Sequence, residues 1–406
     1  MAVPANTINE IRFTGNLKTK ERILRQELTV RVGSKLDSQE LEYSRQSIMD
    51  LGLFKSVTVE VLEKNVVLFT VKEKRYLLLL PRFSRDSDTD KITPGIKLTV
   101  DNIAGLNQRA TLTLKQSDAD DASSGDKDEV GLSYYYPKMF GTQYSLDVLL
   151  GFSREPLQFF SAGSPVADYK RQEIDLGFIV SRWLKKTGPS TGWVAGAGPR
   201  LHYNRYDYVS GMSGIYSDDH AISLLGQIFY TDIHDHLYSR TGLNYGYVLE
   251  QGLKGLGSDY DYNRHLFFYR QFYRLDRPHH NLNWQVRLGL SDDASSNLNE
   301  DVYSIGGYGD LRAYDSSTGG AAFVMLNVEY LRPMFDSNQV RGLLFADVGD
   351  AFVKNSDLDL SDLKWSVGTG LRWKIKSFVN LSLSLEYAYN VDTSENKVYF
   401  RTSGPF

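Results

Sequence analysis

The sequence lacks cysteine, lacks a long hydrophobic run and carries little excess charge of either sign. Because cysteine is absent, disulfides, thiolate chemistry and zinc–cysteine sites are excluded. No run of about 18 or more apolar residues occurs, so a membrane-spanning helix is not expected. The most apolar stretch, YLLLLP at 76–81, is far too short. The net charge of -4 argues against a nucleic-acid partner, which would require a basic face.

Motifs that carry catalysis are also missing. The sequence contains neither G-x-S-x-G nor H-E-x-x-H. Gly307 and Gly309 suggest a nucleotide-binding loop, but the third glycine and the strand-to-helix context are absent. We therefore expect no enzymatic activity, no catalytic residue and no cofactor.

Clusters of histidine and aspartate give only weak metal signals. The histidine clusters have no third ligand at strand-face spacing; they are His234, Asp235 and His236, and His279 with His280. The acidic segment DSDTD at 86–90 lacks the glycine and the distant glutamate of a calcium loop. The same holds for a second acidic cluster, formed by Asp118, Asp120, Asp121, Asp126 and Asp128. We expect solvated turns and outer loops at these positions and no metal site.

The length of 406 residues fits two or three average domains, or one small domain followed by one large barrel. The first residues, MAVPANTINE, have neither the basic region nor the apolar core of a signal peptide. If the protein is exported, we expect this sequence to be that of the mature chain.

Helix and strand signals alternate before Lys74 and predict a small βααββ domain over residues 1–75. INEIRF at 8–13 alternates as a strand, and Ile23, Leu24 and Leu28 have helical spacing. Ser38 is a candidate N-cap for a second helix. Two alternating segments follow, at 57–61 and 66–71, and predict a hairpin. A core this small is marginal alone, which indicates a module attached to something larger.

Helical periodicity disappears over residues 76–406, and period-two alternation replaces it. The alternating segments are too long for a soluble sandwich, in which strands average about 5 to 6 residues. They predict an antiparallel transmembrane β-barrel of about sixteen strands, an even number. We expect strands at 76–85, 93–101, 108–117, 129–136, 143–154, 167–183, 192–208, 221–231, 239–251, 262–273, 281–291, 321–332, 340–350, 363–374, 379–389 and 396–402.

The connections between these segments differ in a regular way. Alternate links are long, acidic and rich in serine and glycine, as at 117–128, 209–219, 292–320 and 350–362. The other links are short, as at 102–107, 137–142, 185–191, 332–338 and 375–378. Long outer loops opposite short periplasmic turns are typical of outer-membrane barrels. This pattern predicts that the N-terminal domain and the C-terminus share the periplasmic side.

Residues 7–74 resemble a POTRA domain, the periplasmic polypeptide-transport module. The matching pieces are IRFTGN at 11–16, Gly33, Leu36-Asp37, LGLFKSVTVEV at 51–61 and VKEK at 71–74. The combination is fairly specific, although each piece alone is weak. The resemblance implies that an exposed sheet edge captures extended clients by strand addition.

The barrel region resembles the outer-membrane protein 85 superfamily, the BamA-like proteins. Three segments carry the resemblance: IGGYGDLRAYD at 305–315, LNVEY at 326–330 and FADVG at 345–349. In that family an arginine at the tip of a long inward loop is held in the lumen by acidic residues on neighbouring strands. Carried over, the loop is 292–320, and the lumen lock consists of Arg312, Asp347, Glu329, Tyr314 and Gly307.

Two departures from the family pattern stand out. The usual loop tip is Val-Arg-Gly followed by an aromatic residue, whereas Ala313 follows Arg312 here. Because alanine reaches positive φ less easily than glycine, we expect a different backbone shape at this tip. The chain ends in the aromatic Phe406, as in the family, but Gly404-Pro405 precedes it. Proline cannot donate to a ladder, so we expect the last strand to end or kink early.

The resemblance implies an outer-membrane pore that translocates or assembles polypeptide, or lipid-linked, clients. Its partners would be the lipid bilayer and those clients, and the sequence leaves homo-oligomer formation open. A lateral seam would join 77–85 to 396–402, with Leu79, Phe83, Tyr399 and Phe400 as its candidate residues. The alternative is a surface barrel or membrane anchor that transports nothing and whose outer loops bind ligands or a partner.

Overall fold

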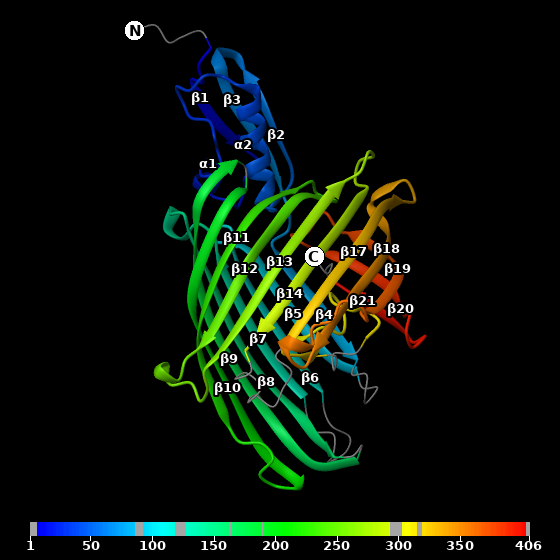
Figure 1. Ribbon diagram of the computed structural model, residues 1–406. Coiled ribbons are helices and arrows are strands. Elements are labelled where there is room, and N and C mark those ends of the chain that lie inside the picture. The colour runs from blue at the N-terminus through cyan, green and yellow to red at the C-terminus, as the bar shows by residue number, and fades with distance from the viewer. Residues whose placement is uncertain are drawn as a thin grey trace.

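The computed structural model describes residues 6–85, 92–117, 127–161, 164–188, 190–292, 303–314 and 319–402. These residues form a small N-terminal domain that sits on one end of a large barrel (Figure 1). None of the helices in these ranges is long and apolar enough to cross a membrane.

The N-terminal domain has the βααββ order predicted from the sequence. Its elements are β1 (Glu10–Thr14), α1 (Glu21–Arg25), α2 (Ser38–Asp50), β2 (Phe54–Leu62) and β3 (Val66–Glu73). The sheet order is β1-β3-β2, with β1 parallel to β3 and β2 antiparallel to it, so β2 is a sheet edge. The N-cap of α2 is Asp37 and not the predicted Ser38, because the Asp37 carboxylate accepts hydrogen bonds from the backbone of Gln39 and Glu40.

The core of this domain includes residues from the barrel. Leu24, Ile48 and Phe69 are fully buried at its centre, and Val379, from a barrel turn, is buried in the same cluster. The backbone of Arg75 pairs with that turn, accepting from Val379 and donating to Ser377 at 2.7 Å. The domain therefore shares its core with the barrel rim.

Polar contacts extend this junction along the rim. The Asp50 carboxylate accepts from the Asp235 backbone at 3.0 Å and lies 2.8 Å from Nδ1 of His234. On the other side, Lys138 donates to the Gln26 carbonyl at 3.1 Å and pairs with Glu27. Burial lowers the pKa of the Lys138 ammonium, and Glu27 opposes this shift. These polar contacts add to the shared core in holding the domain on the rim.

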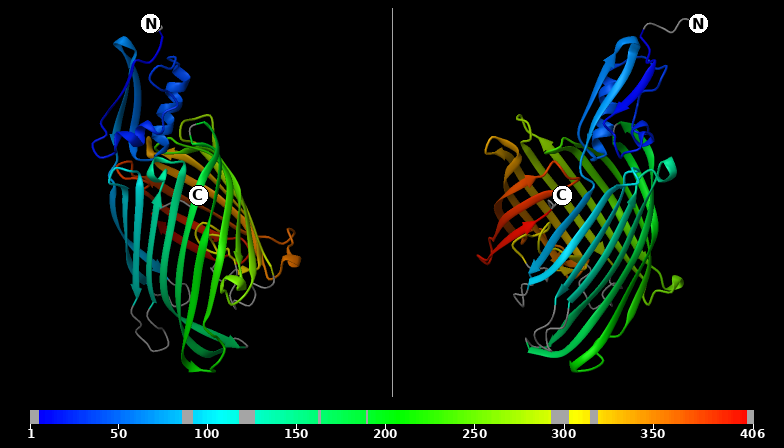
Figure 2. Two further views of the ribbon diagram at one scale, coloured as in Figure 1. Left: turned by 90° about the vertical axis from the view of Figure 1, so that its left-hand side faces the viewer. Right: turned by 180° about the vertical axis from the view of Figure 1, so that it is seen from behind.

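Sixteen strands form one antiparallel sheet, which confirms the predicted barrel. They are β4 (Leu77–Arg85), β5 (Ile92–Ile103), β6 (Gln108–Ser117), β7 (Lys127–Tyr136), β8 (Tyr144–Ser161), β9 (Ser164–Gly188), β10 (Thr191–Gly211), β11 (Asp219–Asp235), β12 (Arg240–Gly252), β13 (Tyr262–Arg274), β14 (Asn281–Ser291), β17 (Ala322–Met334), β18 (Ser337–Phe352), β19 (Lys364–Lys374), β20 (Ser382–Asn390) and β21 (Asn396–Arg401). Strands β8 to β10 are longer than predicted and extend the barrel at the end away from the N-terminal domain (Figure 2).

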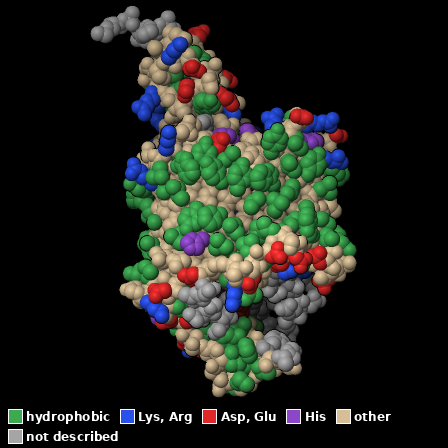
Figure 3. All heavy atoms as spheres, viewed as in Figure 1, with side chains coloured by type: hydrophobic (Ala, Val, Ile, Leu, Met, Phe, Trp, Pro, Cys, Tyr) green, Lys and Arg blue, Asp and Glu red, His purple; other side chains and the backbone are tan. Residues whose placement is uncertain are grey.

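Alternation along the strands produces two different faces. Leu132, Leu150 and Leu176 lie opposite one another across β7, β8 and β9, and each is about two-fifths exposed on the outside. Outward apolar side chains also form a band across the face of the barrel shown in Figure 3, with charged residues above and below it. The alternate positions, such as Ser133 and Asp175, face the lumen. An apolar exterior with a polar interior is the pattern of a membrane-spanning barrel.

The two edges of the sheet are β4 and β21, and both face the viewer in the right-hand view of Figure 2. Among the described residues no backbone ladder connects them: β4 pairs only with β5, and β21 only with β20. Strand β21 runs toward the end of the barrel that carries the N-terminal domain. The predicted kink at Gly404-Pro405 lies outside the described residues, as do Asp86, Asp118, Asp120, Asp121 and Asp126.

Candidate functional site

The connection between β14 and β17 contributes an inward loop with a tight tip, described here over residues 303–314. Tyr303–Ser304 (β15) pairs with Gly319–Gly320 (β16) at the base of this inward loop. At the tip, the Leu311 amide donates to the Ile305 carbonyl at 2.8 Å, and the Gly307 amide donates to the Leu311 carbonyl at 3.0 Å. Gly307 has a φ of 100°, a conformation for which glycine is suited. The tip therefore has a fixed shape.

Apolar contacts hold the inward loop against the barrel wall. Ile305 and Leu311 are buried against Phe323 and Met325, which face inward from β17. Polar contacts add to this: Arg287 of β14 donates to the Gly309 carbonyl at 3.1 Å, and the Asn327 amide donates to the Asp310 carbonyl at 2.9 Å. This packing positions the residue that follows Leu311 deep in the lumen wall.

That residue is Arg312, which is fully buried. Its Nε and Nη2 donate to the two carboxylate oxygens of Asp347 on β18, at 2.8 and 2.7 Å. Its Nη1 donates to Glu329 on β17 at 2.8 Å and to Glu386 on β20 at 2.9 Å. A guanidinium with a carboxylate on each side has its donors satisfied in the planar geometry that arginine favours.

A second arginine completes this ion cluster. Arg372 of β19 donates to both oxygens of Glu329, at 2.9 and 3.0 Å, and to Glu386 at 3.1 Å. Two guanidinium groups thus meet three carboxylates, all of them almost inaccessible to solvent. We call Arg312, Glu329, Asp347, Arg372 and Glu386 the ion cluster. Because it links the inward loop to β17, β18, β19 and β20, it fastens the loop to a wall of consecutive strands.

Aromatic rings cover the cluster. The Arg312 guanidinium carbon lies 3.5 Å from the centroid of the Phe345 ring, a cation–π contact. The hydroxyl of Tyr399, on the last strand, donates to the Arg312 carbonyl at 2.6 Å. Tyr308 donates to Glu386 at 3.2 Å. The inward loop therefore also contacts the strand that forms one edge of the sheet.

The structure brings together the predicted lock residues Arg312, Asp347 and Glu329. Of the other two, Tyr314 bonds to Asp392 beyond β20, and Gly307 shapes the tip without touching the cluster. The expected difference in backbone shape from the usual family tip stays a prediction. Ala313 does not have a positive φ, so alanine adopts its backbone conformation here without strain. Its methyl group instead packs in a buried cluster with Leu331 and Leu343.

Sequence reasoning missed Glu386 and Arg372. A signal for Glu386 was present, since LSLEY at 383–387 parallels LNVEY at 326–330 and places a glutamate in the lumen-facing phase. Ser384, Glu386 and Ala388 are buried, whereas Leu385 and Tyr387 are exposed on the outside. Arg372 gave no such signal, because its partners depend on the strand order.

The candidate seam residues do not form one contact group. Leu79 and Phe400 are outward on the two unpaired edges and about two-thirds exposed. Tyr399 points the other way, into the lumen, where it contacts Arg312. Phe83 lies in β4 opposite Pro94, and its side chain is outside the described residues.

The histidines of the two candidate clusters lie at the barrel end that carries the N-terminal domain. His234 bonds to Asp50 and Asp232, and His279 bonds to Ser239. Within the described ranges, histidine, aspartate and glutamate side chains do not gather in groups of three or more that could hold a metal ion.

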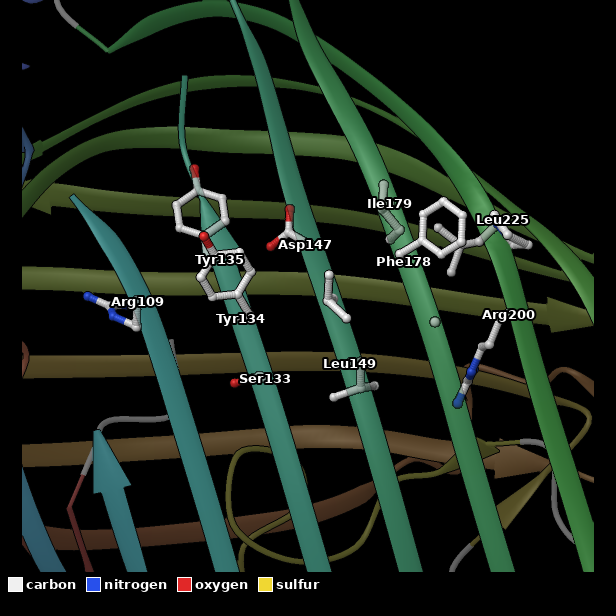
Figure 4. A pocket seen from close by; sticks show the side chains of 13 residues that line it. Arg109, Ser133, Tyr134, Tyr135, Asp147, Leu149, Phe178, Ile179, Arg200 and Leu225 are labelled. Carbon is white, nitrogen blue, oxygen red and sulfur yellow. The ribbon is translucent and has the colours of Figure 1, made fainter. Parts of the chain in front are cut away.

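A cavity of about 410 Å³ lies on the lumen wall opposite the ion cluster (Figure 4). Tyr135, Asp147, Leu149 and Ile179 line it from β7, β8 and β9, with Arg200 on β10 at its margin. Leu149 is 46% exposed although it faces inward. The lumen thus has a filled wall and an open wall.

Comparisons with known proteins agree with this architecture. Residues 6–74 match the POTRA family model, described as a surface antigen variable number repeat, and residues 102–406 match the Omp85 superfamily domain. No curated protein sequence matched the chain.

Three solved structures share the fold at low sequence identity. BamA from Haemophilus ducreyi lacking POTRA domains 1–3 is 16% identical, with a TM-score of 0.54 over 97% of this chain and 83% of that one. CdiB from Acinetobacter baumannii is 13% identical, with a TM-score of 0.63 over 97% of this chain and 73% of that one. CdiB from Escherichia coli is 15% identical, with a TM-score of 0.67 over 97% and 75%. With one POTRA domain, a sixteen-stranded barrel and the Omp85 domain over most of its length, the chain belongs to the Omp85 superfamily.

Proposed function

We propose that this protein is a non-enzymatic outer-membrane pore that translocates or assembles polypeptide clients. Its N-terminal domain and C-terminus lie in the periplasm, and its long loops face outward. Membership of a superfamily of outer-membrane barrels that act on polypeptides supports this proposal. The single observation that carries it is the open sheet, in which β4 and β21 remain unpaired among the described residues.

Unpaired strand edges are costly in a membrane, because lipid cannot satisfy backbone N–H and C=O groups. A barrel that keeps such edges gains a place where a client strand pairs or leaves sideways. The β2 edge of the POTRA domain offers a second pairing site on the periplasmic side. A client would thus meet one sheet edge before the membrane and another within it.

The test is to close the seam by cross-linking. The chain has no cysteine, so Leu79→Cys with Phe400→Cys introduces the only thiols, which a flexible bis-maleimide joins. Leu112→Cys with Leu132→Cys is the matched control, because these residues already lie opposite each other on paired strands. The measurement is the outer-membrane protein content of cells that depend on the variant.

We expect joining of the seam to deplete outer-membrane or exported proteins, while joining of the control pair changes nothing. Unchanged content after complete cross-linking of the seam would overturn lateral release. If deletion of the whole protein also left the content unchanged, transport would be refuted, and the non-transporting surface barrel would stand.

The surface-barrel alternative has one observation in its favour. The extended ends of β9 and β10 and the connection that follows β10 carry packed tyrosines, with Tyr206 and Tyr216 stacked at 5.0 Å and Tyr169 edge-on to Tyr216 at 5.1 Å. Such rings suit ligand contact outside the cell. Replacing Tyr208, half-exposed beside them, with serine would abolish ligand binding in this alternative and leave the outer-membrane protein content of the cells unchanged.

A further inference from the structure

A second cavity, of about 230 Å³, lies in the lumen at the end next to the POTRA domain. Basic side chains from three strands line it: Arg240 of β12, Arg341 of β18, and Arg372 and Lys374 of β19. Asp235 is the one acidic residue in the described part of the lining, and the Asp235 carboxylate already accepts from the Leu237 amide at 2.7 Å. The cavity therefore has a strongly positive lining.

Three of the four cations of this cavity, all except Arg372, have no ion-paired carboxylate among the residues that the structure describes. Arg341 is only 8% exposed, and its hydrogen-bond partner is the neutral Asn281, at 3.3 Å. In the described part of the chain, no carboxylate forms an ion pair with Arg240, Arg341 or Lys374. The contrast with Arg312, which has three carboxylates around it, is sharp. Burying a cation without an opposite charge is expensive, so these side chains favour an anion beside them.

Two buried polar atoms at the cavity also lack hydrogen-bond partners among the described residues. They are Nε of Arg372, a donor, and Oδ1 of Asn283, an acceptor. Buried groups of this kind are normally satisfied, and an unsatisfied pair in one cavity indicates a missing ligand. The ligand must accept hydrogen bonds from arginine and lysine and also donate one to Asn283.

We propose that this cavity binds a phosphate group that retains a hydroxyl, as free hydrogen phosphate or as a phosphomonoester. Arginine forks match phosphate oxygens, and a charge between -1 and -2 balances several cations. The remaining P–OH supplies the donor for Asn283 Oδ1, which a carboxylate at neutral pH cannot do. The inference does not depend on transport, since it concerns the lining of the lumen alone.

Binding at this cavity has a consequence for the ion cluster. Arg372 belongs to both sites: its Nη atoms bond to Glu329 and Glu386, and its Nε faces the cavity without a partner. A phosphate bound to Nε of Arg372 would compete with Glu329 and Glu386 for the positive charge of the guanidinium. Occupancy of the cavity is thereby communicated to the residues that hold the inward loop.

Calorimetric titration of the full chain, refolded in zwitterionic detergent without phosphate, tests the proposal. The probes are inorganic phosphate, dihexanoyl phosphatidic acid as a lipid phosphomonoester, sulfate as an anion without a hydroxyl donor, and an acidic peptide. The variants are Arg341→Gln and Lys374→Gln. Arg332→Gln is the matched control, because Arg332 lies exposed on the outside of β17 at the same end.

We expect saturable binding of inorganic phosphate that weakens at least about tenfold in Arg341→Gln and in Lys374→Gln and is unchanged in Arg332→Gln. Sulfate should bind more weakly than phosphate. Tighter binding of the short-chain lipid would identify a headgroup as the source, and equal or weaker binding would identify the free anion. Either result supports the phosphate site.

Absence of saturable phosphate binding, equal affinity in all variants, or binding of the acidic peptide alone would overturn the proposal. A second measurement covers the case of a misfolded variant. Phosphate should raise the unfolding temperature of the wild type and leave that of Arg341→Gln unchanged. Arg341→Gln should also be at least as stable as the wild type without phosphate, since it removes a buried charge that has no counterion.

Discussion

The lumen has two walls that are built by the same strand alternation, but only one of them is covered by the inward loop. On the wall formed by β14 and β17 to β20, the inward loop covers the strands, and Arg312, Glu329 and Asp347 are fully buried. On the wall formed by β6 to β9, nothing described covers the inner face, and Leu149 borders a cavity of about 410 Å³. The difference shows that the loop does not plug the barrel evenly. A path through the lumen would follow the open wall.

Each wall contains an arginine–aspartate ion pair of similar geometry, but the two pairs differ in their exposure to water. Arg200 of β10 bonds to both oxygens of Asp175, at 2.9 and 2.6 Å, much as Arg312 bonds to Asp347. The Arg200 side chain is 30% exposed, however, whereas that of Arg312 is 0% exposed. Water screens the first pair and is excluded from the second. Removing one partner should therefore change the free energy of unfolding by different amounts, although the hydrogen-bond geometry is similar.

The largest effect is expected from Arg312→Ala. This change leaves three carboxylates with one guanidinium in a dry site and should cost about 3–5 kcal/mol of unfolding free energy. Urea unfolding of the refolded barrel measures it, with the outward Arg332→Ala as control. A loss no larger than that of the control would show that the ion cluster does not hold the loop.

Thiol labelling compares the two walls directly. Leu149→Cys on the open wall should react with a charged, water-soluble maleimide at least about tenfold faster than Leu343→Cys, which is 2% exposed under the loop. The chain has no other cysteine, so the rates need no background correction. Similar rates at the two positions would contradict the description of a filled wall and an open wall.

Arg200→Ala removes two partly exposed ion pairs, with Asp175 and with Glu250, on the far side of the lumen. We expect a loss of roughly 1 kcal/mol in the same urea assay, well below that of Arg312→Ala. A loss equal to that of Arg312→Ala would mean that solvent access does not separate the two arginine sites.

The smallest effect is expected from Ala313→Gly, which restores the loop tip usual in the family. Because Ala313 has an ordinary φ and a buried methyl group, the change should cost about 0.5–1 kcal/mol. A gain in stability would mean that the alanine strains the tip.

The sequence predicted the positions of the strands well, because the outward face of each strand contacts lipid. Alternation in segments such as LTVDN and SLSLEY placed all sixteen strands, because each outward face must be apolar regardless of its neighbours. The ends of β8 and β9 were missed, since Pro156 and Pro165 interrupt a pattern that nevertheless continues beyond the apolar band.

Features that depend on several strands at once were not predictable in this way. Arg312 and its first two acidic partners followed from resemblance, but Arg372 required knowledge of which strands are adjacent and how they are registered. The unpaired edges, the two unequal walls and the basic cavity also depend on closure and loop placement. The sequence of a single strand segment therefore does not predict these features.

The central claim is that Arg312 locks the inward loop to one wall of a membrane pore. Single-channel conductance of the refolded protein in a planar bilayer, wild type against Arg312→Ala, tests it most directly. We expect the wild type to insert and conduct, and the variant to show larger or more frequently switching currents, because the released loop moves in the lumen. Identical currents in the two proteins would refute the lock, and failure of both to insert would refute the membrane barrel.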